Sequence, residues 1–222
     1  MRTITVDGNS KIYVQPTLMT LSITISGETD TFEDSVRKST DETETFKDIL
    51  EGLGFKRSDL KTKKLDIDTR TESYKDENGN YKRRFAGYKY THNMFIEFPN
   101  DNKKLGKILT GLVKSKIEFE FTVSYTISES EKEEYTEKLI SEAVYDAKRR
   151  AEILAKAAEV ELGNVVSINH SDFMPGNFSS NFMLSDSLED MSMDCMSPDI
   201  EFSIDSKDIE LSDDVNMVWE IR

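Results

Sequence analysis

Residues 128–163 constrain the fold of this chain more than any other stretch, because they predict one long helix. Its apolar positions recur every three or four residues, which places them on one stripe. The stripe consists of Tyr135, Leu139, Ala143, Ala147, Ala151, Leu154 and Ala158. Because most of these residues are alanines, the helix axis can lie close to the surface it covers, and we expect that surface to be a β-sheet. Gly163 is expected to end the helix.

The start of this helix is signalled twice. Ser128 and Ser130 are each followed three residues later by a glutamate, Glu131 and Glu133, which is the spacing of a capping box. One of the two serines is therefore expected to be the N-cap. Acidic residues crowd the first turns and basic residues come later, as the helix dipole favours.

The composition is that of a globular chain that can bury a core. The 222 residues include 36% hydrophobic and 32% charged residues. No stretch approaches the length of about 18 apolar residues needed to span a membrane, and residues 1–30 lack the pattern of a secretory signal. The single Cys195 fits a reducing compartment and equally fits a cysteine-poor exported protein. We therefore expect a cytoplasmic location for the sequence as given and no membrane span.

The remaining periodic segments predict alternating strands and helices. A short first strand at residues 3–6 is expected to end in a turn at residues 7–10, and Asn78-Gly79 predicts the turn of a β-hairpin. Residues 31–53 predict a helix that ends at Gly54. Its apolar stripe consists of Phe32, Val36, Phe46, Leu50 and Leu53.

The order of these elements predicts an α+β fold in one domain over residues 1–222. Strand, helix, strand, strand occurs twice, over about residues 18–98 and 117–221, with a short helix between the two units. We expect antiparallel or mixed sheets covered by the long alanine-rich helix. An acidic, methionine-rich insertion at about residues 174–205 has no periodic pattern and is expected to be flexible or to make contacts. Its Phe178, Phe182 and Met183 favour contact with a partner or another subunit.

The net charge of −14 disfavours general binding to nucleic acid, but the charge is unevenly spread. Residues 56–90 carry about +5 and residues 170–214 about −11. The candidate interaction surface on the basic hairpin consists of Lys61, Lys63, Lys64, Arg70, Lys82, Arg83 and Arg84, interleaved with aromatic residues. We favour a solvated hairpin with cross-strand aromatic pairs over a site for nucleic acid or another polyanion. A third interpretation is that the acidic segment of a neighbouring subunit docks on this hairpin.

No residue pattern predicts a catalytic site, a cofactor or a metal. His92 and His170 both fall in the apolar phase of a strand without a carboxylate or thiol in the same phase, which favours buried or hydrogen-bonded histidines over metal ligands. Cys195 lies among acidic residues, which disfavours a nucleophilic thiolate. Phosphate-binding, nucleophile-elbow and zinc-protease motifs do not occur. We therefore expect a protein that is not an enzyme.

Several short motifs resemble one known family. They are ITVDG at residues 4–8, VQP at 14–16, LGF at 53–55 with DLKT at 59–62, AVYDAKRRAEILA at 143–155 and LGNV at 162–165. On these residues the chain resembles the SIMPL domain family, a domain of unknown function. The resemblance implies an α+β fold and a tendency to oligomerise, offers no catalytic residues, and leaves a periplasmic or exported location open.

The function we expect is that of a non-enzymatic, self-associating binding or scaffold protein. Homo-oligomers are the expected assemblies, and the acidic insertion could contact another protein partner. The alternative is a binder of an anionic ligand or nucleic acid through the basic hairpin at residues 56–90. Light-scattering masses and salt-dependent binding separate these two functions.

Overall fold

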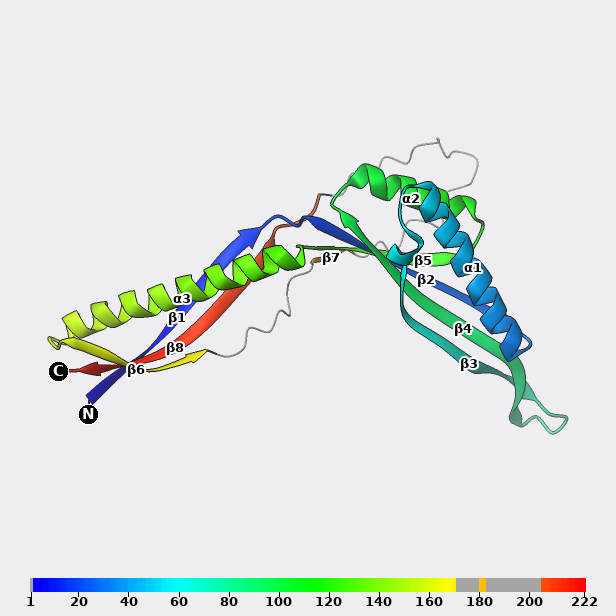
Figure 1. Ribbon diagram of the computed structural model, residues 1–222. Helices are drawn as coiled ribbons and strands as arrows, with labels where there is room; N and C mark the ends of the chain where they lie inside the picture. Colours follow the sequence, from blue (N-terminus) through cyan, green and yellow to red (C-terminus); the bar gives the residue numbers. More distant parts are fainter. Residues whose placement is uncertain (1, 171–179, 183–204) are drawn as a thin grey trace. The chain divides into compact units, whose positions relative to one another are not determined.

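The computed structural model describes residues 2–170, 180–182 and 205–222 (Figure 1). The chain forms two compact units. Unit 1 contains residues 1–18, 125–180 and 206–222, and unit 2 contains residues 19–124 and 181–205. Both units combine helices with an antiparallel sheet, so the expected α+β class is confirmed.

Unit 1 places one helix on a three-stranded sheet. The strands are β1 (Arg2–Val14), β8 (Ile209–Ile221) and β6 (Leu162–His170), in the order β1-β8-β6. β1 and β8 pair along their whole length, from Arg2 opposite Ile221 to Val14 opposite Ile209. Helix α3 (Glu129–Ala157) runs along one face of this sheet (Figure 1).

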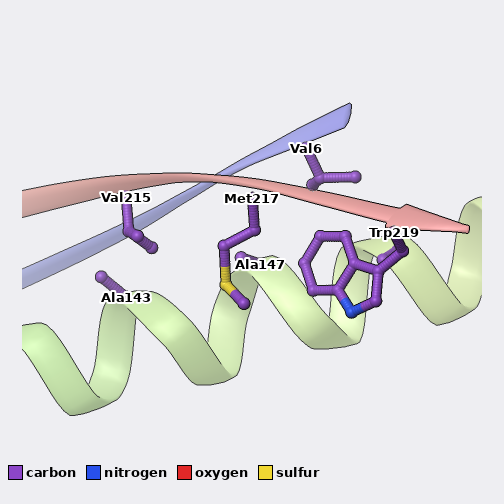
Figure 2. Packing of buried hydrophobic residues seen from close by; sticks show 7 residues of the cluster. Val6, Ala143, Ala147, Val215, Met217 and Trp219 are labelled. Atoms are coloured by element: carbon purple, nitrogen blue, oxygen red, sulfur yellow. The ribbon is translucent and has the colours of Figure 1, made fainter. Parts of the chain in front are cut away.

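The alanine stripe of α3 is buried against the sheet, as the sequence predicts. Ala143, Ala147 and Ala151 share a hydrophobic cluster with larger side chains of β1 and β8. Figure 2 shows Val215, Met217 and Trp219 reaching from β8 towards the helix, on the side where Ala143 and Ala147 lie. Small side chains on the helix therefore make room for large ones on the strands, which keeps the interior closely packed.

Gly8 lies at the centre of this packing, and the predicted turn at residues 7–10 is wrong. β1 continues through these residues to Val14. A Cβ atom added at Gly8 would lie 2.1 Å from the carbonyl oxygen of Ala143 and 2.6 Å from the Cβ of Ala147. The glycine is needed because the backbones of β1 and α3 approach so closely, and not because the chain turns.

The end of α3 also differs from the prediction. The helix ends at Ala157, and Glu159 takes the left-handed conformation with a φ of 53° that glycine usually supplies after a helix. Gly163 lies instead in β6, where an added Cβ would come within 2.9 Å of the Cβ of Glu220. Leu154 is exposed and Ala155 takes its place in the buried stripe, because the regular 3.6-residue period favours Ala155 after Ala151.

Unit 2 contains a five-stranded sheet in the order β3-β4-β2-β5-β7. Its strands are β2 (Leu18–Thr29), β3 (Lys61–Lys75), β4 (Tyr81–Pro99), β5 (Phe119–Thr126) and β7 (Ser180–Phe182). Its helices are α1 (Phe32–Gly52), the 3-10 turn η1 (Arg57–Asp59) and α2 (Asn102–Lys114). α1 packs on β4 and α2 contacts α1 (Figure 1). The alanine-rich helix thus covers the smaller sheet only, and α1 packs on the larger one.

Helix α1 ends as predicted, but of its predicted apolar stripe only Phe46 and Leu50, in the second half of the helix, are fully buried. Gly54 adopts a φ of 88°, its N–H donates to the carbonyl of Glu51, and the N–H of Phe55 donates to that of Leu50, which together form a Schellman motif. Phe32 and Val36, expected in the apolar stripe, are exposed at 51% and 39%. The helix buries three hydroxyl residues instead, Ser35, Ser39 and Thr43. Ser39 and Thr43 have a partner on β4 and Ser35 has one in Thr29 of β2, which the sequence pattern did not reveal.

Candidate interaction surfaces

The β3–β4 hairpin turns where the sequence predicts. Gly79 has a φ of 80°, and the connection spans residues 76–80. The Asp76 carboxylate accepts hydrogen bonds from the backbone N–H groups of Asn78 (3.0 Å) and Asn80 (2.9 Å). The backbone N–H of Asn80 and the Lys82 ammonium hold the pKa of Asp76 below its ordinary value. An ionised aspartate therefore fixes the tip of the hairpin.

The two faces of this hairpin differ because of a β-bulge. Opposite Arg70, β4 has two residues, Ala86 and Gly87, and Gly87 has a φ of 106°. The extra residue shifts the alternation, so that Tyr88, Phe85, Arg83 and Tyr81 lie opposite Thr69, Thr71, Ser73 and Lys75. These residues share the face on which α1 packs, since Tyr88 contacts Phe32 at the start of α1 with ring centroids 6.0 Å apart.

We call the opposite side of the hairpin the paired face, because its cations contact carboxylates. Lys64 lies 2.8 Å from Asp66, Arg70 3.2 Å from Glu28, Lys82 3.1 Å from Asp76, and Arg84 3.4 Å from Glu72. Four of the seven cations predicted as an interaction surface are thus already neutralised locally. Exposed ion pairs of this kind contribute little stability, but they remove the free charge that an anionic ligand would need.

The α1 side of the hairpin, which we call the aromatic face, consists of Lys75, Tyr81, Arg83, Phe85 and Tyr88. Tyr81 is 75% exposed and Phe85 57% exposed. Phe85 and Tyr88 meet edge to face at 5.3 Å, and the Lys75 ammonium lies 5.0 Å from the centre of the Tyr81 ring. Over residues 65–75 and 81–88, no carboxylate lies on this face, because Asp66, Asp68 and Glu72 all belong to the opposite side.

Arg83 is the cation of the predicted set that the aromatic face presents. Among the described residues, its guanidinium has no ion-pair partner. Lys61 lies at the start of β3, with its ammonium 6.0 Å from the centre of the Phe95 ring, and Lys63 falls at a second register shift. The structure therefore does not gather the seven predicted cations into one patch. Asp66, Asp68 and Glu72 are separated by even numbers of residues, so a regular strand places their side chains on one face. This spacing was the sequence signal that could have distinguished the two faces of the hairpin.

A second surface, on β6, was not predicted. β6 is an edge strand, and its Val165, Val166 and Ile168 are exposed at 47%, 45% and 55%. Its nine residues, Leu162–His170, include no Lys, Arg, Asp or Glu. The other edge strand, β1, carries Arg2, Asp7 and Lys11. An edge strand with exposed apolar side chains and no charges is open to pairing with another strand.

The two histidines lie in separate hydrogen-bond networks. His92, buried in unit 2, has Nδ1 3.0 Å from the Ser39 hydroxyl and 3.1 Å from that of Thr43, with Nε2 2.9 Å from the Thr62 hydroxyl. Burial lowers the pKa of His92, and the charge of Lys47 adds to this effect. The hydroxyls of Ser39 and Thr43 on α1 thus provide hydrogen-bond partners for a neutral imidazole.

His170 and Asp213 form a pair in unit 1. Nε2 of His170 lies 3.0 Å from the carboxylate of Asp213, which also accepts a hydrogen bond from the backbone N–H of Asp214 at 2.8 Å. Asp213 interrupts the apolar side of β8, and its partner comes from the neighbouring β6. Both histidines are hydrogen-bonded, as the sequence analysis favoured. No group of three or more His, Cys, Asp and Glu residues in the described part of the chain is arranged to hold a metal.

Part of the predicted interaction surface lies outside the described residues. This applies to Phe178 and Met183, and also to Cys195 and most of the acidic insertion. Phe182 is the last residue of β7. Within the described residues, no helix combines the length and apolar composition required to cross a membrane.

Comparison with known proteins places the chain in a family without assigning a reaction. No curated protein matches it. A family model described as SIMPL, a protein of unknown function (DUF541), matches residues 4–219. Because the match extends over almost all of the 222 residues and includes both units, the chain belongs to the SIMPL family.

Proposed function

We propose that this protein is a non-enzymatic scaffold or binding domain that associates with copies of itself through the free edge of β6. The uncharged, apolar edge of this strand is the observation that carries the proposal. Its outer backbone N–H and C=O groups can continue the sheet into another strand. Exposed Val165, Val166 and Ile168 would lose contact with water in the same step.

A second copy of β6 is the partner that this edge fits best. The net charge of −14 makes two copies of the protein repel each other. Two uncharged strands can approach without adding to that repulsion. Antiparallel pairing of β6 with itself around a two-fold axis would extend each three-stranded sheet across the interface.

Light scattering on the full chain tests this proposal. The wild type should show a mass above that of the monomer that rises with concentration. Val166→Lys with Ile168→Lys should lower this mass at every concentration, because lysine on an edge strand opposes strand pairing. The control is Thr3→Lys with Thr5→Lys, which adds the same two charges at exposed positions on the other edge strand. A monomeric wild type, or a double variant with the same mass as the wild type at every concentration, contradicts the proposal.

Binding of an anionic partner by the hairpin is a second candidate function. The aromatic face supports it, since Lys75 and Arg83 lie there among exposed rings. The paired face does not, since its cations already contact carboxylates. Nucleic acid as the partner would show as a steep loss of affinity with added salt in a filter-binding titration.

A further inference from the structure

We infer that the aromatic face of the hairpin binds the acidic segment formed by residues 183–204 of a second copy of this chain. The inference builds on the proposed self-association, but it uses a surface other than β6. It joins an exposed aromatic surface with an acidic stretch of the sequence that contains no lysine or arginine.

The aromatic face offers two kinds of contact to an extended polypeptide. Tyr81 and Phe85 expose flat apolar surface, and Phe32 and Val36 continue it onto the start of α1. Arg83 adds a guanidinium without a carboxylate partner among the described residues, and Lys75 adds an ammonium beside Tyr81. A ligand for this face therefore needs both carboxylates and flexible apolar side chains.

The sequence of residues 183–204 meets both needs. Its 22 residues include six carboxylates and no lysine or arginine. It also carries Met183, Met191, Met193 and Met196, and Phe202 lies close to its C-terminal end. Thioether sulfur makes favourable contacts with aromatic rings, and carboxylates form strong charge-assisted hydrogen bonds with guanidinium.

The same face suits nucleic acid less well. Only two cations lie on it, whereas a strand of nucleic acid presents a phosphate with every nucleotide. The protein as a whole is also strongly acidic, with a net charge of −14. A short acidic peptide can form ion pairs with both cations and gain further affinity from contacts with the aromatic rings.

The position of β7 favours a second copy as the donor of the segment. Residues 183–204 follow β7, which is the last strand at the edge of the five-stranded sheet opposite to β3. The segment is therefore tethered to one edge of the sheet, and the hairpin lies at the other. A neighbouring chain can present its segment without having to cross the sheet.

Fluorescence anisotropy with a labelled peptide of residues 183–204 and the full-length protein tests the contact. We expect saturable binding that Tyr81→Ser with Arg83→Ser weakens by about tenfold or more, since both the ring and the guanidinium are lost. Lys82→Ser with Arg84→Ser on the paired face is the matched control and should change the affinity little. A peptide with its methionines and Phe202 replaced by serine should also bind weakly.

Three results would overturn the inference. The first is that the peptide does not bind, and the second is that the variants of both faces lose the same amount of affinity for it. The third is that a single-stranded oligonucleotide of similar charge binds as tightly as the peptide and depends on the same two residues. Circular dichroism checks that the variants remain folded, which is expected because Tyr81 is largely exposed and neither residue contributes to the core.

A mixing experiment identifies the donor chain. A chain with Tyr81→Ser and Arg83→Ser keeps its segment, and a chain with the six segment acids changed to Asn or Gln keeps its aromatic face. With Val166→Lys and Ile168→Lys present in both, the mixture should form a heterodimer that neither protein forms alone. Absence of this complex, with peptide binding intact, would place the contact within one chain and refute the role of a second copy, whatever the outcome for β6.

Discussion

Gly8 is the residue that sets how closely α3 can approach its sheet. An added Cβ would meet the backbone carbonyl of Ala143 at 2.1 Å, and a backbone atom inside a helix cannot move aside alone. The side chain of Ala147, at 2.6 Å, blocks the remaining space. The close approach of α3 to β1 therefore depends on both the alanine stripe and Gly8, because a larger side chain on either side would separate the two backbones.

Gly8→Ala is expected to lower the free energy of unfolding of unit 1 by about 1–3 kcal/mol, the usual cost of overpacking a well-packed interior. Urea unfolding followed by Trp219 fluorescence measures it, because this single tryptophan lies in the same cluster. Gly52→Ala is the control, and because Gly52 belongs to unit 2 the unfolding of this variant is followed by circular dichroism. An added Cβ there meets nothing within 4 Å, so that variant should be neutral or slightly more stable. An unchanged midpoint for Gly8→Ala would show that α3 can shift at no cost.

Ser128 is the N-cap of helix α3, and this decides between the two capping boxes that the sequence allows. The hydroxyl of Ser128 accepts from the backbone N–H of Glu131 at 3.4 Å, and the carboxylate of Glu131 accepts from the backbone N–H of Ser128 at 2.8 Å. Thr17 donates to the same carboxylate at 2.6 Å. The hydroxyls of Ser128 and Thr17 lower the pKa of Glu131, so the cap holds its charge in neutral solution.

Ser128→Ala should therefore destabilise unit 1 by about 1 kcal/mol, the typical cost of losing an N-cap. Ser130→Ala is the matched control, since Ser130 lies inside the first turn and is expected to change stability little. Thermal unfolding followed by Trp219 fluorescence compares the two. Equal effects of both substitutions would mean that the helix start frays and that neither serine acts as a fixed cap.

At the scale of the whole molecule, the chain has two units with separate cores. Trp219 reports on unit 1, and buried His92 belongs to unit 2. The pKa of His92 is lowered in the folded state, so the unfolded state binds its proton more readily. The stability that a neutral His92 provides is complete above about pH 6.5 and declines as the pH falls from there towards the folded-state pKa.

Lowering the pH from 7.5 to 5.5 should therefore weaken unit 2, by up to about 1.4 kcal/mol for each pH unit inside that window. Urea unfolding followed by circular dichroism should show this loss, and His92→Gln should abolish it. The transition seen by Trp219 fluorescence should be the same in the wild type and in His92→Gln at each pH. If the variant changes both transitions equally, the two units unfold as one.

The sequence predicted regular elements well where one period dominates. The stripe of α3, the Gly54 end of α1 and the hairpin turn at Gly79 depend on neighbours within a few residues. It failed where a distant segment sets the environment. The sequence analysis placed no hydroxyl residue in the buried stripe of α1, whereas Ser39 and Thr43 are buried where they meet His92 of β4.

The candidate surfaces were harder to predict than the elements. Composition identified the hairpin as basic and aromatic, but only the bulge at Gly87 and the strand register decide which cations face carboxylates and which face open rings. For β6, the lack of charge is visible in the sequence, whereas its position at the edge of the sheet depends on pairing with β8, more than forty residues later in the chain.

By itself the sequence determined the α+β class, the alanine-lined helix and the uneven charge, because these follow from periodicity and composition along a local stretch. Only the tertiary structure decided that Gly8 packs against α3, that a histidine needs the hydroxyls of α1, and that β6 and the aromatic face are exposed. The physical reason is the same in each case: burial and pairing are properties of two segments brought together, and neither segment encodes them alone.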